Sequence, residues 1–80
     1  MKKYIEITKI NYIKEFQLEI CFNNDSNKII DLEQYINHSG GVFKQLQNTD
    51  QFKKFKIDMA GGISWECGAD LAPDMLINME

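Results

Sequence analysis

The feature that most constrains the fold is a strict alternation of apolar and polar residues early in the chain. Phe16, Leu18, Ile20 and Phe22 occupy every second position, and mainly polar side chains stand between them. Successive side chains of a β-strand point to opposite faces of a sheet. The spacing therefore predicts a strand with one buried face and one solvated face, as is typical of an antiparallel sheet.

Two further strands are predicted beside this one. Residues 4–7 alternate in the same way, and the phase shifts near Lys9, which predicts a bulge or bend before the apolar residues resume. Residues 23–27 (NNDSN) favour a turn, and residues 28–32 (KIIDL) return as a third strand. The first half of the chain is therefore expected to form an antiparallel meander.

Short helices are predicted in the second half. Asp31 can act as a cap or turn acceptor for residues 32–37 (LEQYIN), and residues 42–46 add an apolar patch too short for a long helix. Residues 48–55 (NTDQFKKF) are typical of one or two capped helical turns. Residues 73–79 (PDMLINM) predict a final helix, because proline suits the first helical position.

A hairpin is predicted between these helices, and it completes the expected fold. Residues 56–59 (KIDM) and 63–65 (ISW) flank a Gly61–Gly62 pair, which tolerates positive φ. A chain of 80 residues fits a single domain over residues 1–80. The predicted class is α+β: a small antiparallel meander plus a C-terminal hairpin with two or three short helices, as a single layer of sheet packed on helices.

Composition limits the classes of function. Nine basic and 12 acidic residues give a net charge of −3, and no apolar run is long enough for a secretory signal or a membrane span, so a cytoplasmic protein is expected. Cys21, Cys67 and the single His38 lack metal-binding spacing, so no disulfide, metal or cofactor is expected. Direct nucleic-acid binding is not expected, because residues 52–56 (FKKFK) best fit a solvated helix face in an acidic chain.

The densest group of polar residues lies at positions 65–75 (WECGADLAPDM). Glu66, Asp70 and Asp74 could serve as an acid and base pair or as metal ligands. The favoured interpretation is structural: Asp70 caps the final helix and Asp74 sits favourably at the positive end of its dipole. On that interpretation Asp70→Ala should destabilise the domain by about 0.5 to 2 kcal/mol.

Three other residues of this segment have a structural and a functional interpretation. Trp65 is either a core residue, which is favoured in so small a domain, or a binding anchor. Gly68 is expected to provide a sharp turn that only glycine adopts at low cost. Cys67 has no neighbouring histidine to activate it and stands between two acidic residues, so thiol catalysis is not expected.

The longer motifs resemble a known family. Residues 40–52 (GGVFKQLQNTDQF) and 63–76 (ISWECGADLAPDML), with the signature WxxGADLAPDxL, are similar to a family of small bacterial proteins known only as a domain of unknown function, number twenty-four forty-two. The resemblance implies a fold like the N-terminal domain of some longer proteins that carry a helix-turn-helix domain. It also implies genes arranged as in toxin–antitoxin pairs. Neither setting implies an enzyme.

The expected function is therefore a non-catalytic protein-binding or regulatory module, the antitoxin-like half of a two-protein system. Its partner would be another small protein encoded by a neighbouring gene, and a homo-oligomer is compatible with the sequence. Direct DNA contact is not expected, because residue 80 follows directly on the last predicted helix. The contact surface is an open sheet edge or the terminal segment, with Trp65, Glu66, Gly68, Asp70 and Asp74 as its residues. The alternative is a small carboxylate-dependent enzyme or metal-binding domain built on Glu66, Asp70 and Asp74.

Overall fold

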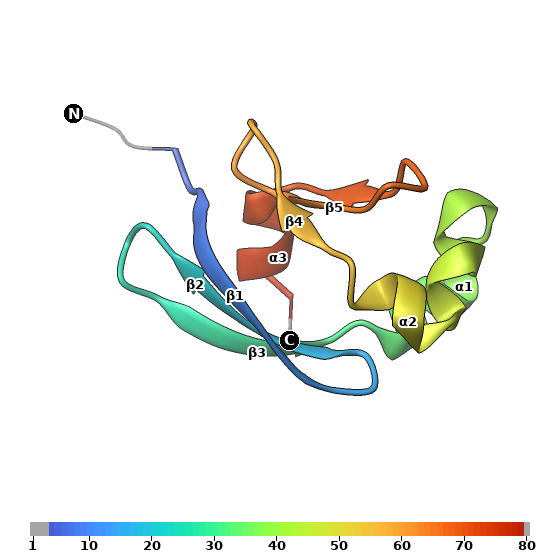
Figure 1. Cartoon of the computed structure of the whole chain (residues 1–80). Helices are drawn as coiled ribbons and strands as arrows, with labels where there is room; N and C mark the ends of the chain where they lie inside the picture. The colour runs from blue at the N-terminus through green and yellow to red at the C-terminus, as the bar shows by residue number, and fades with distance from the viewer. Residues whose placement is uncertain (1–3, 80) are drawn as a thin grey trace.

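The computed structural model describes residues 4–79 and contains two small antiparallel sheets joined by short helices (Figure 1). In chain order the elements are β1 (Ile7–Lys14), β2 (Gln17–Phe22), β3 (Asn27–Asp31), α1 (Glu33–Ser39), the 3₁₀ helix η1 (Gly41–Gln47), α2 (Thr49–Phe52), β4 (Lys56–Ile57), β5 (Ile63–Ser64), β6 (Asp70–Leu71) and α3 (Pro73–Ile77). The predicted α+β class is confirmed.

The first sheet is the predicted meander, with strand order β1-β2-β3 and antiparallel pairing throughout. The register shifts between Ile7 and Lys9, which confirms the irregularity expected there. Strand β1 begins only at Ile7, however, so the expected strand from Tyr4 to Glu6 is wrong. The Asn23 side chain holds those residues instead: its amide donates to the Tyr4 carbonyl at 2.8 Å, and its oxygen accepts from the Glu6 N–H.

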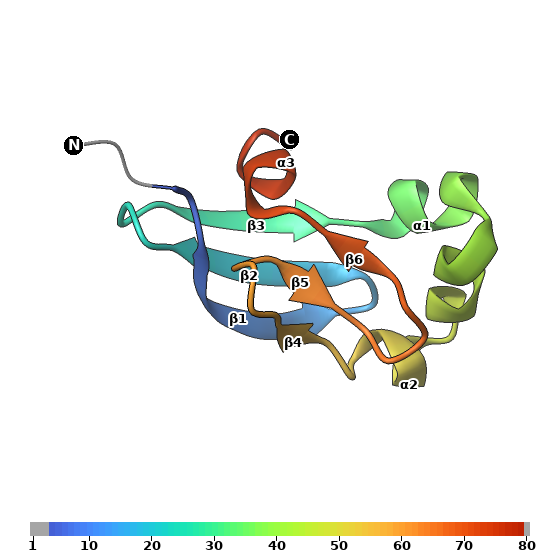
Figure 2. The same cartoon turned by 90° about the horizontal axis from the view of Figure 1, so that it is seen from above.

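The second sheet contains the predicted hairpin and one strand that the sequence pattern does not reveal. β4 pairs with β5 as expected, and β6 adds a third strand through Ser64↔Asp70 and Ile63↔Leu71. This sheet lies over one face of the meander (Figure 2). The expected single layer of sheet is therefore two layers, because Ile63 and Leu71 are buried in the same core as the inner face of the meander.

One hydrophobic core lies between the sheets and the helices. Its buried members are Ile7, Leu18, Ile20, Phe22, Ile30, Leu32, Ile36, Leu46, Phe52, Ile63, Trp65, Ala69, Leu71 and Leu76. Phe52 stands among aromatic rings, with the ring centroids of Phe16 at 5.2 Å and Tyr12 at 6.3 Å. The alternation from Leu18 to Phe22 is thus confirmed as the buried face of the central strand β2.

Polar side chains accept backbone N–H groups at the starts of α1 and α2, and a glycine lies at the end of α1. Asp31 Oδ1 accepts from the Glu33 N–H at 2.9 Å, which confirms the expected turn acceptor. The expected capped turn begins at Asn48, the N-cap of α2, whose Oδ1 accepts from the Asp50 N–H at 2.8 Å. Gly40 ends α1 with φ of 67°. The helices α1, η1 and α2 gather at one end of the molecule (Figures 1 and 2).

A lysine of the meander hydrogen-bonds to the C-terminal end of helix α3, whose Leu76 is also buried in the shared core. The Lys28 ammonium on β3 donates to the carbonyl of Ile77 at 2.8 Å and to the carbonyl of Met79. Pro73 occupies the first turn of α3, as predicted. Within residues 4–79, no helix combines the length and the apolar character needed to cross a membrane.

Candidate functional site

The structure separates the five predicted contact residues into three environments. Trp65, which follows β5, is only 4% exposed and belongs to the core. Its indole Nε1–H donates to the Phe52 carbonyl at 2.8 Å, and its ring stacks on the Phe52 ring with centroids 5.8 Å apart. Trp65 therefore anchors the core to the end of α2, and its ring is not part of the accessible surface.

Glu66 and Gly68 belong to the tight turn between β5 and β6. The Gly68 N–H donates to the Trp65 carbonyl at 3.0 Å, and the Trp65 N–H donates to the Ala69 carbonyl at 2.9 Å. Gly68 has φ of 100°, which confirms the predicted glycine turn. Cys67 in the same turn directs its thiol at the Val42 carbonyl, with Sγ and O 3.6 Å apart, and so connects the turn to η1.

Asp70 does not cap the final helix, so the capping prediction is wrong. Its backbone pairs with Ser64 in β6, and its side chain is exposed. The N-cap of α3 is Ala72, which makes no side-chain capping hydrogen bond. Pro73 at the first helical position has no N–H to be capped, which lowers the need for a capping side chain. Asp74 lies in the first helical turn, as expected.

These positions give a revised prediction for stability. Asp70→Ala should change the free energy of unfolding by no more than about 0.5 kcal/mol, because an exposed strand side chain without a structural role contributes little. Gly68→Val should cost about 1 to 3 kcal/mol, because valine must adopt a positive φ, although no atom lies within 4 Å of the position that its Cβ would occupy. Urea denaturation of both variants measures this difference. A larger loss for Asp70→Ala than for Gly68→Val would contradict the assignment.

The alternative metal site requires that carboxylates converge. Glu66 lies in the β5–β6 turn, whereas Asp70 lies in β6 and Asp74 in α3. Across the described residues 4–79, no group of three or more His, Cys, Asp or Glu side chains is placed to hold a metal ion. The three carboxylates are therefore not assembled as a ligand set.

A different arrangement does converge, at the Gly61–Gly62 pair. A Cβ atom on Gly61 would lie 2.6 Å from Glu6 Cγ, and one on Gly62 would lie 2.4 Å from the Leu71 carbonyl oxygen. The Ile7 N–H also donates to the Gly61 carbonyl at 2.8 Å. The two glycines therefore allow three segments distant in sequence, 4–6, 58–62 and 70–74, to pack closely together.

We call the surface between these three segments the junction groove. It consists of two adjoining depressions of about 160 and 690 Å³ that share Ala60, Ala72 and Pro73. The remaining lining residues are Tyr4, Ile5, Glu6, Asp58, Met59, Gly62, Asp70, Leu71 and Asp74. Of the predicted contact residues, the groove contains Asp70 and Asp74, and it excludes Trp65, Glu66 and Gly68.

Several groove residues were not predicted from the sequence. Met59 is fully exposed and Tyr4 is 83% exposed, so two large apolar side chains project at this surface. Asp58 closes the 58–62 turn, which contains Met59, because its Oδ1 accepts from the N–H groups of Ala60 and Gly62, both at 3.0 Å. The local sequence signal for this surface was Met59, because a methionine within the tight turn of residues 58–62 (DMAGG) indicates an exposed apolar side chain.

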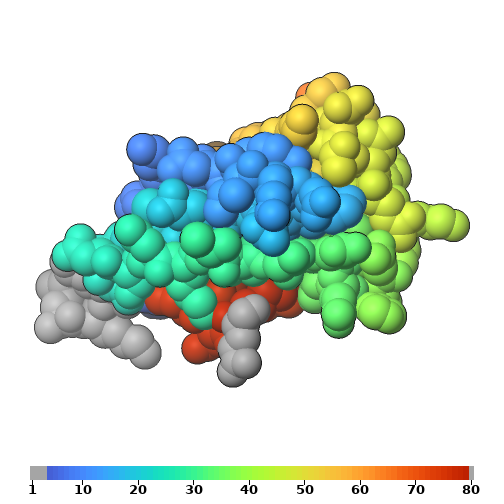
Figure 3. Space-filling model, turned by 90° about the horizontal axis from the view of Figure 1, so that it is seen from below, coloured from blue at the N-terminus to red at the C-terminus, as the bar shows by residue number. Residues whose placement is uncertain are grey.

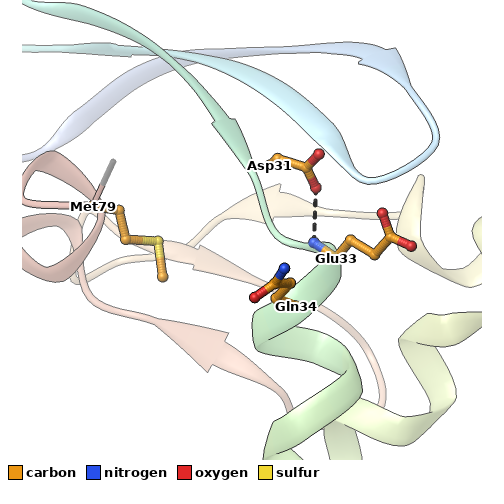
Figure 4. Close-up of a pocket in the computed structure, with 4 residues that line it drawn as sticks. All are labelled: Asp31, Glu33, Gln34 and Met79. Carbon is orange, nitrogen blue, oxygen red and sulfur yellow. Dashed lines mark hydrogen bonds between the residues drawn. The ribbon is translucent and has the colours of Figure 1, made fainter.

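A separate depression of about 380 Å³ lies where β3 meets α1 and the C-terminal segment. Figure 4 shows Met79 on one side of it and Asp31 and Gln34 on the other, with the Glu33 carboxylate directed away from Met79. Asp31 is already used as the acceptor for the Glu33 N–H. Two carboxylates line this depression, whereas four line the junction groove.

Figure 3 shows the outer face of the meander, which the second sheet does not cover. Its cross-strand rows are mostly polar, and the Asn11 amide donates to the Glu19 carboxylate across β1 and β2. Two isoleucines of the meander are also exposed, Ile29 on β3 at 65% and Ile13 on β1 at 41%. This face matches the solvated side predicted for an antiparallel sheet.

The sequence was also compared with known proteins. A family described as protein of unknown function (DUF2442) matches residues 7–80, which is nearly the whole chain. The chain belongs to this family. No curated protein matches the DUF2442 chain, and no solved structure does.

The DUF2442 match includes two of the three segments that form the junction groove. Residues 58–62 and 70–74 lie inside the matched range, whereas residues 4–6 precede it. The turn containing Gly61–Gly62 and the start of α3 therefore belong to the family domain. Tyr4 and Glu6 are contributed by the segment ahead of it.

Proposed function

We propose that this DUF2442 chain is a non-catalytic protein-binding module that acts as the regulatory, antitoxin-like member of a two-protein system. The observation that carries the proposal is the junction groove, where Met59 and Tyr4 project two large apolar side chains into solvent beside carboxylates. Exposed apolar side chains gathered at a polar-rimmed depression mark surfaces that contact other proteins.

The partner we propose is a small protein encoded by a neighbouring gene. The resemblance of the terminal signature to the family supports this choice, because members of that family occur in arrangements similar to toxin–antitoxin pairs. The net charge of −3 favours a basic partner, since complementary charge accelerates encounter and suppresses wrong partners. In this role the chain would bind and mask its partner without chemical turnover.

The proposal predicts a stoichiometric complex. The chain and the neighbour-encoded protein, purified separately, should elute together in size-exclusion chromatography and bind with a dissociation constant of about 1 μM or tighter, as for a specific interface. Expression of the neighbour alone should slow growth, and co-expression of the chain should restore it. Separate elution together with unchanged growth would contradict the proposal.

The carboxylate-dependent alternative predicts a different result. Titration with Mg²⁺, Mn²⁺ or Zn²⁺ would then shift the amide resonances of Glu66, Asp70 and Asp74 together in an NMR spectrum. Because the structure does not bring these residues together as ligands, we expect no coordinated shift at micromolar metal. Such a shift would favour the metal-binding alternative over the protein-binding one.

A further inference from the structure

We propose that the junction groove binds a segment of the partner protein that presents Lys or Arg side chains beside an aliphatic side chain. This inference rests on the proposed function, and it adds where the partner binds and which chemistry it carries.

The apolar part of the groove supplies the contact for the aliphatic side chain. Tyr4 and Met59 project from two different walls, and Ala60, Ala72 and Pro73 lie between the two depressions. Methionine is unbranched and polarisable, and it adapts to the shape of a bound side chain. Covering these side chains would remove apolar surface from water, which favours binding.

The charged part of the groove selects a basic segment. Glu6, Asp58, Asp70 and Asp74 all line it, and none of its lining residues in the described part of the chain is basic. Glu6, Asp70 and Asp74 are exposed. These three carboxylates therefore remain available to Lys or Arg of a partner.

The groove is also held in shape before any partner binds. Asp58 fixes the 58–62 turn through two backbone N–H groups, and the Ile7–Gly61 hydrogen bond fixes the N-terminal wall against that turn. Gly62 packs directly on the Leu71 carbonyl of the third wall. A preorganised surface loses less entropy on binding than one that must be ordered.

Three synthetic peptides with blocked termini test the chemistry directly. The probe GKLGKLG combines both features, GELGELG reverses the charge, and GKSGKSG removes the aliphatic side chains. In ¹⁵N NMR titrations, GKLGKLG should shift the amides of residues 5–6, 58–62 and 70–74 and bind at least about tenfold more tightly than either control. Equal binding of all three, or shifts confined to the outer face of the meander, would overturn the inference.

Charge variants of the chain test the same surface against the neighbour-encoded protein. The variant Asp70→Asn/Asp74→Asn should weaken that complex at least about tenfold, and the salt dependence of binding should fall. Glu15→Gln/Glu33→Gln is the matched control, because it removes the same charge from exposed positions outside the groove. All four side chains are exposed, and thermal unfolding should show that both variants remain folded.

The outcomes separate the two proposals. If the partner binds Asp70→Asn/Asp74→Asn as tightly as the unchanged chain, the groove inference is wrong and the proposed function stands. If the partner does not bind the unchanged chain, the proposed function is wrong and the peptide titration alone decides the chemistry of the groove. A concentration-dependent oligomer in sedimentation that is lost in Asp70→Asn/Asp74→Asn would show that a second copy occupies the groove, which would overturn the assignment to a partner protein.

Discussion

Replacing Phe52 with alanine is expected to lower the free energy of unfolding by about 3 to 5 kcal/mol. The Phe52 side chain is fully buried, and its ring contacts the rings of Phe16 and Trp65. A chain of this length has a total stability of roughly 4 to 12 kcal/mol, so the variant should be partly or wholly unfolded at 37 °C. Urea denaturation followed by tryptophan fluorescence measures the loss.

Phe43→Ala is the matched control for this variant. Phe43 is half-buried and pairs only with Tyr35 among the aromatic contacts of the described residues. Its replacement should cost less than half as much, because less apolar surface is removed from the core. Similar losses for both variants would show that the aromatic cluster around Phe52 is not the centre of the core. The Phe52 carbonyl that accepts from Trp65 is retained in Phe52→Ala, so the measured loss reports side-chain packing.

Gly62→Ala is the second substitution with a large expected effect, a loss of at least about 2 kcal/mol of unfolding free energy. Its new methyl group would lie 2.4 Å from the Leu71 carbonyl oxygen and 3.3 Å from Pro73 Cδ. The first of these is a backbone atom of β6, so the strand itself must move. Gly62 does not have positive φ, and the cost is therefore steric. The denaturant midpoint measures it.

Gly41→Ala provides the contrasting control. Gly41 has φ of 55°, but nothing lies within 4 Å of the position its Cβ would occupy. Alanine there should cost only about 1 kcal/mol, from backbone strain alone. If Gly62→Ala were as stable as the unchanged chain, close packing at Gly62 would not be what holds β6 against the 58–62 turn.

The meander could be predicted because its signal is local and repeated. Apolar and polar residues alternate along residues 16–22, and turn-forming residues follow them. The alternation predicts both the strand and its buried face, and the turn residues predict where the strand ends. Strand β6 could not be predicted, because a two-residue strand has no period. Asp70 stands shortly before a proline, a position that favours the N-terminus of a helix. Only its pairing with Ser64 shows that Asp70 belongs to a strand instead.

The junction groove was only half predictable for a different reason. Asp70 and Asp74 belong to a dense polar segment, and so they were candidates from the sequence. Met59 and Tyr4 are 55 positions apart in the chain, and no local pattern places them together. The Gly61–Gly62 pair predicted a turn correctly, but the close approach of Glu6 and Leu71 depends on tertiary packing.

The small sheet has a consequence for hydrogen exchange. Each of its strands contains only two residues, whereas the strands of the meander contain five to eight. Regions held by few backbone hydrogen bonds open locally at lower free energy than the whole molecule. Amides of Ile57, Ile63 and Leu71 should therefore exchange faster than those of Leu18 and Ile20. Because two walls of the junction groove are continuous with this sheet, a bound partner would slow exchange at those amides selectively, even at positions that it does not touch.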